Sequence, residues 1–160
     1  MTSSQGFATI LIIDDELLNR KLLEALMTLQ GYATCTAANA EDALESIQKN
    51  RPDLILLDIM MPGTDGYHFA EIIKSNPALA MIPIIMVTAL TDRSSRLVGI
   101  MAGADDVLTK PVDRSELGLK IRNLLRLREL EVLQQEQGQV AQNYLRESTS
   151  KKLIKVSEIT

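Results

Sequence analysis

The chain has 160 residues, of which 46% are hydrophobic and 24% charged, and this suits one domain with its own core plus a short appendage. Its net charge of -4 gives no electrostatic reason to expect direct contact with nucleic acid or an anionic membrane, because such contacts need clustered Lys and Arg. The single Cys35 cannot form an intramolecular disulfide, and the N-terminal segment lacks the basic start and long apolar run of an export signal. The sequence therefore predicts a cytoplasmic protein without a membrane span.

The first third of the chain alternates between strand and helix patterns. Residues 7–13 are an apolar run typical of a buried strand, and apolar residues then recur at helical spacing until Gly31, which is expected to stop the helix. The helical positions are Leu18, Leu22, Ala25, Leu26 and Leu29. A weaker strand at residues 32–38 leads to Asn39, a plausible N-cap for a helix that must end before Pro52.

The same alternation continues along the chain. Residues 55–58 predict a third strand that is apolar on both faces, residues 81–89 a fourth and residues 104–111 a fifth. Each of these strands is followed by a helical pattern, the last one opened by Asp113. The apolar residues of these three helices are Phe69, Ile72 and Ile73, then Leu97, Ile100 and Met101, then Leu117, Ile121 and Leu124. Short connections between alternating elements predict an α/β fold with a parallel sheet wrapped by helices, since each crossover must return to start the next strand in the same direction.

Polar side chains stand at the ends of the predicted strands. Asp14 and Asp15 end the first strand, Asp58 the third, Thr88 the fourth and Lys110 the fifth. In sheets of this kind ligands bind outside the carboxyl ends of the strands, where the strand order reverses. Taken singly, each residue could be an ordinary strand-end or solvated side chain. Together they predict one pocket built from four separate segments.

The chemistry of this pocket follows from its charges. Carboxylates brought close together repel one another and are driven towards protonation unless a cation lies among them. Oxygen donors without His or Cys nearby favour Mg²⁺, which is commonly held by one or two carboxylates, water and phosphate oxygens. With Lys110 as a further positive charge, we expect Asp58 to attack phosphorus and Thr88 to donate a hydrogen bond to the product.

Four segments, LIIDDE, LILLDIMMPGTDG, MVTA and GADDVLTKP, resemble in order and spacing the signature segments of the receiver domain of bacterial two-component response regulators. The resemblance covers residues 7–125. It implies a (βα)5 flavodoxin-like, doubly wound fold with strand order 2-1-3-4-5. It also implies that a sensor histidine kinase or a histidine phosphotransfer protein phosphorylates Asp58.

Further implications of the resemblance concern individual residues. Mg²⁺ would be held by Asp15, Asp58 and the backbone carbonyl of Met60, with Asp14 acting partly through water. The bond between Lys110 and the proline after it is often cis in the family, and proline makes that isomer accessible. These residues would make the chain a phosphoacceptor signalling domain that catalyses only its own phosphoryl transfer and dephosphorylation.

Two departures from the family pattern affect the expected signalling. The position three before the lysine, usually Tyr or Phe in the family, is Val107, so the usual coupled movement of threonine and aromatic ring cannot occur in its usual form. The positions two after Asp58 and two after Thr88, which in the family tune hydrolysis of the acyl phosphate, are Met60 and Leu90. Neither side chain can orient a water molecule, and we therefore expect a long-lived phosphorylated form.

Two other functions fit part of the pattern. A magnesium-dependent aspartyl phosphatase would use similar groups, but it would usually carry a second acid just after the nucleophile, where Ile59 and Met60 stand. A phosphorylation-independent adaptor would keep the fold and act only through its C-terminal helix. The presence of all the site residues favours the receiver domain over both.

Residues 126–147 are expected to extend the last helix beyond the domain. Apolar residues and one glutamine alternate in steps of three and four, which is the spacing of a coiled coil. They are Leu130, Leu133, Gln137, Val140 and Tyr144. Gly138 weakens the pattern, because glycine inside a helix costs about 1 kcal/mol relative to alanine. We expect a helix that forms a homodimer or transmits a signal; the alternative is a solvated helix or a disordered tail.

Residues 148–160 differ in pattern from the helix before them. STSKK at 148–152 predicts a break in the helix, and LIKVSEIT then alternates apolar and polar residues. We interpret this segment as a linker or as the start of an output domain.

Overall fold

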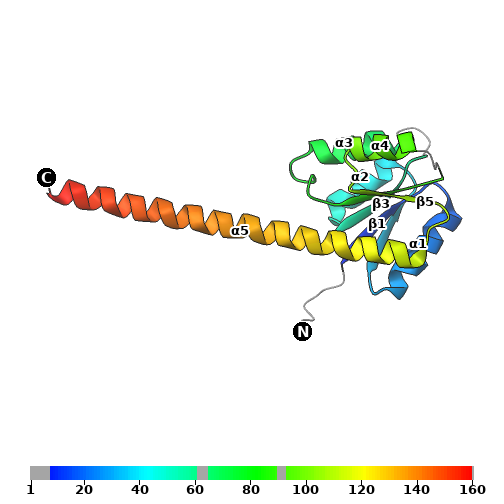
Figure 1. Ribbon diagram of the computed structural model, residues 1–160, viewed down its shortest axis with the longest axis horizontal. Helices are drawn as coiled ribbons and strands as arrows, with labels where there is room; N and C mark the ends of the chain where they lie inside the picture. The colour runs from blue at the N-terminus through cyan, green and yellow to red at the C-terminus, as the bar shows by residue number, and fades with distance from the viewer. Residues whose placement is uncertain (1–7, 61–64, 90–92, 160) are drawn as a thin grey trace. The chain divides into compact units, whose positions relative to one another are not determined.

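The computed structural model describes residues 8–60, 65–89 and 93–159. In these residues the fold is built on one five-stranded parallel sheet with the order β2-β1-β3-β4-β5 (Figure 1). The strands are β1 (Thr9–Ile13), β2 (Ala33–Ala37), β3 (Leu54–Asp58), β4 (Ile84–Thr88) and β5 (Asp106–Thr109). The helices are α1 (Leu17–Leu29), α2 (Ala40–Lys49), α3 (Gly66–Ser75), α4 (Arg93–Met101) and α5 (Arg114–Ile159). The predicted flavodoxin-like fold and strand order are confirmed.

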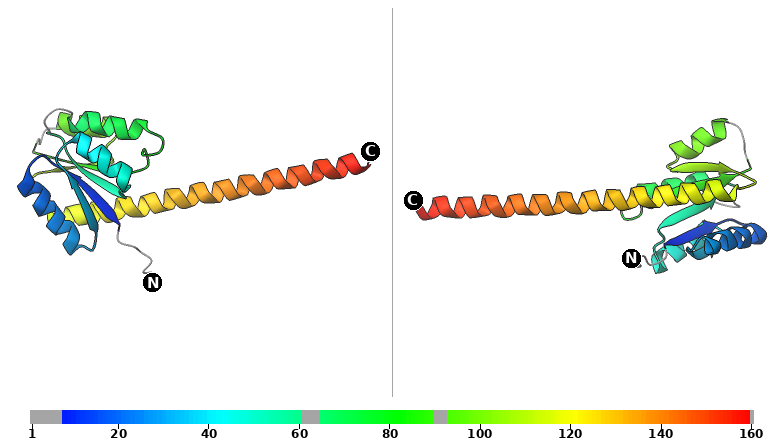
Figure 2. Two further views of the ribbon diagram at one scale, coloured as in Figure 1. Left: turned by 180° about the vertical axis from the view of Figure 1, so that it is seen from behind. Right: turned by 60° about the horizontal axis from the view of Figure 1, so that its bottom comes forward.

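Two apolar clusters cover the two faces of the sheet. Successive strand residues point to opposite faces, so Leu11 and Ile13 of β1 contribute to one cluster while Ile10 and Ile12 contribute to the other. The first cluster includes side chains of α2 and α3, and the second includes side chains of α1 and of the start of α5. Figures 1 and 2 show α2, α3 and α4 on one side of the sheet and α1 on the other. This doubly wound arrangement explains why β3 and β4 are buried along their whole length.

The helix ends follow the signals in the sequence. The side chain of Asn39 accepts a hydrogen bond of 2.8 Å from the backbone N–H of Asp42 and so caps α2 as predicted. Gly31, two residues after α1, has φ of 90°, a conformation that glycine adopts at low cost. The carboxylate of Asp113 accepts from the backbone N–H of Glu116 at 3.0 Å and opens α5. These local signals act as the sequence predicts.

The apolar face of α1 differs from the one that the helical spacing suggested. Leu18, Leu22 and Leu29 are 79%, 60% and 68% exposed, whereas the buried residues of α1 are Leu23 and Met27. The apolar residues predicted for α4 are also exposed; they are Leu97, Ile100 and Met101. The spacing correctly predicted helices here, but most of these apolar residues are exposed; Leu26 is partly buried and packs against the second cluster.

The chain divides into two units, residues Met1–Leu125 and Arg126–Thr160. Unit 1 contains the sheet and its two clusters. Unit 2 consists of the continuation of α5, which reaches Ile159. The predicted break at residues 148–152 is therefore wrong, because a segment without proline or glycine can keep helical hydrogen bonding despite several helix-disfavouring serine and threonine residues. The role of residues 148–160 as a linker or the start of an output domain stays a prediction.

Within residues 8–60, 65–89 and 93–159, no helix combines the length and the hydropathy that a membrane span requires.

Candidate functional site

The predicted site residues of unit 1 meet at the carboxyl edge of the sheet. The register pairs Asp58 of β3 with Val87 and Thr88 of β4 with Thr109 of β5, so these strands end at the same level. Beyond β5, the backbone N–H of Lys110 donates to the carbonyl of Thr88 at 2.7 Å. The sheet thus brings side chains from segments far apart in the sequence to one edge.

Asp14, Asp15 and Asp58 form a compact carboxylate cluster. One oxygen from each residue can be chosen so that all three lie within 4.8 Å of one another. Asp14 and Asp58 are buried, at 1% and 6% exposure, whereas Asp15 is exposed. The cluster therefore has two acids inside the fold and one at its mouth.

Lys110 supplies a positive charge to this cluster. Its Nζ lies 3.6 Å from Oδ2 of Asp14 and 3.7 Å from Oδ1 of Asp58. Both distances are longer than a direct hydrogen bond, so the ammonium acts on both carboxylates as a nearby charge. The ammonium is about equally far from the two carboxylates. It is therefore close enough to interact with a group bound at Asp58.

Backbone hydrogen bonds help to orient the buried carboxylates. Oδ1 of Asp14 accepts from the N–H of Glu16 at 2.9 Å, and Oδ1 of Asp58 accepts from the N–H of Met60 at 3.2 Å. Arg20 of α1 donates from a guanidinium nitrogen to the carbonyl of Asp14 at 2.7 Å. Arg20 thus ties the start of α1 to the end of β1.

The electrostatics of the cluster raise the pKa of Asp58 from 3.8 to about 6. Burial of the carboxyl group is the largest cause, and the negative charge of Asp14 adds to it. Lys110 and the hydrogen bond from Met60 oppose the rise, while Asp15 contributes a smaller increase. Asp58 is still mostly ionised above pH 7, which a nucleophilic carboxylate requires.

The donor set fits a hard divalent cation. When the three carboxylates are ionised, Lys110 compensates one of their negative charges and two remain. Carboxylate oxygens without His or Cys among them are the ligands that Mg²⁺ prefers, and the exposed Asp15 keeps one of them accessible to solvent. An ion of charge +2 would therefore neutralise the remaining charge of the cluster.

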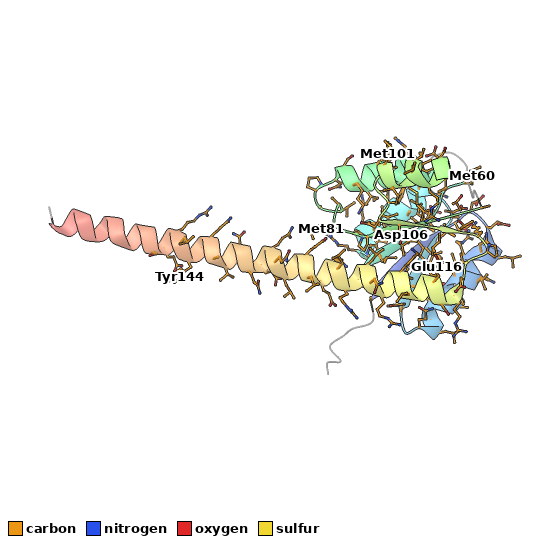
Figure 3. The ribbon with its side chains drawn as sticks, viewed as in Figure 1. Met60, Met81, Met101, Asp106, Glu116 and Tyr144 are labelled. Atoms are coloured by element: carbon orange, nitrogen blue, oxygen red, sulfur yellow. The ribbon has the colours of Figure 1, made fainter. Side chains whose placement is uncertain are left out.

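The remaining predicted site residues also lie at this edge. Thr88 is fully buried at the end of β4. Met60, labelled in Figure 3, lies after the end of β3. The residue is 64% exposed, and the use of its carbonyl as a metal ligand stays a prediction. The bond between Lys110 and Pro111 is cis, as the resemblance implied. Val107 is buried in β5, and Leu90 lies outside the described residues.

Gly66 lies against the site, although no pattern considered in the sequence predicted this. A Cβ atom at Gly66 would lie 2.7 Å from both the carbonyl oxygen of Asp58 and the Cα of Ile59, so no larger residue fits without moving backbone. The N–H of Gly66 also donates to the carbonyl of Ile59 at 2.9 Å. The Asp-Gly pair at the start of α3 was the available signal, since glycine there can mark a close backbone approach.

Comparison with known proteins gives consistent results. The sequence model of the response regulator receiver domain family matches residues 10–122 of the chain. Response regulator PleD of Caulobacter vibrioides is 41% identical over 121 residues, which are 76% of this chain and 27% of PleD. The probable transcriptional regulator ycf27 of Cyanophora paradoxa is 44% identical over 117 residues, which are 73% of this chain and 48% of that protein.

A solved structure shows the same likeness. The crystal structure of a putative response regulator from Chloroflexus aurantiacus J-10-fl matches with a TM-score of 0.73 and 37% identity, covering 76% of this chain and 99% of that one. The present chain spans less than half the length of PleD and ycf27. Together with the fold, these matches show that the chain belongs to the response regulator receiver domain family, a family of signalling domains.

Proposed function

We propose that the chain is a phosphoacceptor module that receives a phosphoryl group on Asp58 from a sensor histidine kinase or a histidine phosphotransfer protein. The observation that carries this proposal is the convergence of Asp14, Asp15 and Asp58 within 4.8 Å beside the ammonium group of Lys110. Bringing carboxylates together in this way costs free energy of folding, and such clusters are typical of functional sites. A cation and a phosphoryl group bound here would offset and use the clustered charge. The reaction would depend on Mg²⁺, and phosphorylation would alter conformation or dimerisation to control an effector.

Each side chain has a defined role in this reaction. A carboxylate oxygen of Asp58 attacks phosphorus, forming an acyl phosphate while the bond from phosphorus to the donor nitrogen breaks. Lys110 compensates negative charge on the phosphoryl oxygens, and the hydroxyl of Thr88 donates a hydrogen bond to one of them. Mg²⁺ bound by Asp14, Asp15, Asp58 and the Met60 carbonyl would supply further charge compensation.

Phosphorylation would change the charge balance at a buried position. It replaces the single negative charge of Asp58 with about two and adds acceptor oxygens. Such a change can shift the balance between two conformers of similar free energy, because the phosphoryl group interacts more favourably with one conformer than with the other. Since Val107 replaces the usual aromatic residue of the family, the response here would not depend on ring movement at that position.

The test treats the protein with acetyl phosphate, with and without Mg²⁺, and measures the mass of the intact chain. We expect a gain of one phosphoryl group that requires Mg²⁺ and is lost in Asp58→Asn. Glu41→Gln is the matched control, since Glu41 is an exposed acid of α2 outside the cluster and its variant should gain the same mass as the wild type.

Other outcomes would identify the competing functions. Phosphorylation of Asp58→Asn to the wild-type level would refute Asp58 as the acceptor. Repeated turnover of a small phosphate ester would favour an aspartyl phosphatase. An adaptor that acts without phosphorylation would show no mass gain under any condition, and a beryllofluoride mimic would leave its scattering and spectra unchanged.

A further inference from the structure

Unit 2 presents an apolar stripe along one side of its helix. Four large apolar residues of this stripe are at least half exposed: Leu130 (51%), Leu133 (50%), Val140 (67%) and Tyr144 (71%). Tyr144 is labelled in Figure 3. Leu133, Gln137, Val140 and Tyr144 line one groove on the helix surface. Unit 2 is a single helix and supplies no second element to cover this stripe within the described residues.

The stripe has the spacing of a two-stranded coiled coil. Leu130, Gln137 and Tyr144 take the a positions of successive heptads, and Leu133 and Val140 take the d positions. The next d position is Glu147. In a pair of helices the two Glu147 carboxylates would face each other, so the stripe ends before this residue. We call the residues from Leu130 to Tyr144 at these positions the seam.

Gln137 indicates which partner the seam fits. A glutamine at an a position has to find hydrogen bonds, because burying an unpaired amide is unfavourable. In two identical helices that run parallel and in register, Gln137 of one copy faces Gln137 of the other, and the two amides can donate to and accept from each other. A different partner would need its own polar residue at that level.

The charged residues beside the seam indicate the direction of pairing. Glu129 and Glu136 take g positions, whereas the e positions are Gln134 and Ala141. In a parallel pair each g residue faces an e residue of the other helix, so each glutamate meets a neutral side chain. In an antiparallel pair a positions face d positions, so Gln137 would lie against Leu133 or Val140 with no amide to pair with. In the register that sets Gln137 against Leu133, g faces g and Glu136 meets Glu136, which is destabilising.

We propose that the seam binds a second copy of this chain in a parallel, in-register coiled coil. The seam is short and contains a polar residue, so the association should be weak and depend on protein concentration. It involves only side chains of unit 2 and does not rest on phosphorylation of Asp58. The test therefore uses the full-length, unphosphorylated protein, and its outcome is independent of the outcome of the acetyl phosphate experiment.

Light scattering over a range of concentrations tests the seam. We expect the wild-type mass to rise from one chain towards two, and Val140→Asp to remain at one chain throughout. The matched control is Gln142→Asp, which places the same charge two residues further on, at the exposed f position. It should associate like the wild type. A wild type that stays at one chain, or an equal loss of association in both variants, would overturn the proposal.

Cysteine crosslinking tests the direction. Cys35 is the only native cysteine, so Leu133→Cys, at a d position, and Tyr144→Cys, at an a position, are made separately in a Cys35→Ser background. In a parallel, in-register pair each variant crosslinks with itself under mild oxidation, because identical positions face each other. Crosslinks that form only when the two variants are mixed would show antiparallel pairing and overturn the proposed geometry.

Discussion

Asp58 occupies a position that is unfavourable for a charged group. It is 6% exposed, lies beside Asp14, and has a pKa raised to about 6. The folded protein therefore holds the proton of Asp58 more tightly than the unfolded chain does, and ionisation of this group costs stability. The same property would make the site receptive to a cation, which would offset that cost.

The first prediction concerns the pH dependence of stability without divalent cations. Because the folded pKa lies above the unfolded value of 3.8, the contribution of Asp58 is fully present below about pH 3.8 and is lost as pH rises through about 6. Asp58→Asn cannot ionise, so its stability relative to the wild type should increase over this range by about 1–3 kcal/mol. Urea unfolding at pH 4.5 and at pH 8 measures this. A difference that is constant with pH, or that shrinks towards pH 8, would contradict the prediction.

The second prediction concerns the lifetime of phosphorylated Asp58. The side chain of Met60 is exposed next to the acceptor and has no group that could orient an attacking water. We expect the phosphoryl group to persist for minutes or longer after removal of the donor, and Met60→Asn to shorten its lifetime by supplying a polar amide. Met101→Asn changes an exposed methionine on α4 and should leave the lifetime unchanged. Loss of the wild-type phosphoryl group within seconds would refute the prediction.

At the scale of elements, the sequence predicted what depends on local patterns and strand ends. The cap at Asn39 and the stop at Gly31 need only neighbouring backbone, and both occur as expected. The site could be predicted because parallel strands end together, which places their last residues side by side whatever the details of packing. The convergence of the carboxylates and Lys110 follows from that rule.

The sequence could not predict what depends on how elements meet. Helix α1 carries two apolar stripes, one with Leu18 and Leu22 and one with Leu23 and Met27, and spacing alone does not tell which stripe faces the sheet. Gly66 was missed for a similar reason, because its need for glycine comes from the backbone of Asp58 in another element. Periodicity along the chain identifies helices, while contacts between elements decide which face is buried.

Lys74 connects the end of α3 to two other segments of unit 1. Its Nζ donates to the carbonyls of Ala80 and Ile82 at 3.0 and 2.7 Å, and lies 3.2 Å from Oδ2 of Asp105. That carboxylate oxygen also accepts from the N–H of Ile84 at 2.8 Å. One ammonium group therefore holds α3, the start of β4 and the start of β5 together.

The third prediction is that Lys74→Met destabilises unit 1. Two carbonyls and a carboxylate would lose a charged donor, at a cost of about 1–3 kcal/mol. The matched control is Lys49→Met, since Lys49 pairs with Glu45 on the exposed face of α2 with both side chains mostly exposed. Its loss should change stability by no more than about 0.5 kcal/mol. Urea unfolding of the two variants, monitored by circular dichroism, measures this. Equal shifts of the two unfolding midpoints would contradict the prediction.

The two units have different sources of stability. Unit 1 buries apolar side chains on both faces of its sheet, and β3 and β4 are buried throughout. Unit 2 is helix alone, and the side chains from Arg126 to Glu147 are exposed or only partly buried. Since isolated helices gain little free energy without tertiary packing, unit 2 should open far more readily than unit 1.

The fourth prediction therefore concerns hydrogen exchange at several protein concentrations. Amides of β1, β3 and β4 should exchange slowly and at the same rate at all concentrations, because their protection comes from the core of one chain. Amides of residues 130–144 should exchange quickly in dilute protein and more slowly as concentration rises, because pairing of the seam stabilises the helix by mass action. Val140→Asp should abolish this concentration dependence and leave the strands unchanged. If residues 130–144 were as protected as β3 in dilute protein, their helix would have to be stabilised by something other than a second copy.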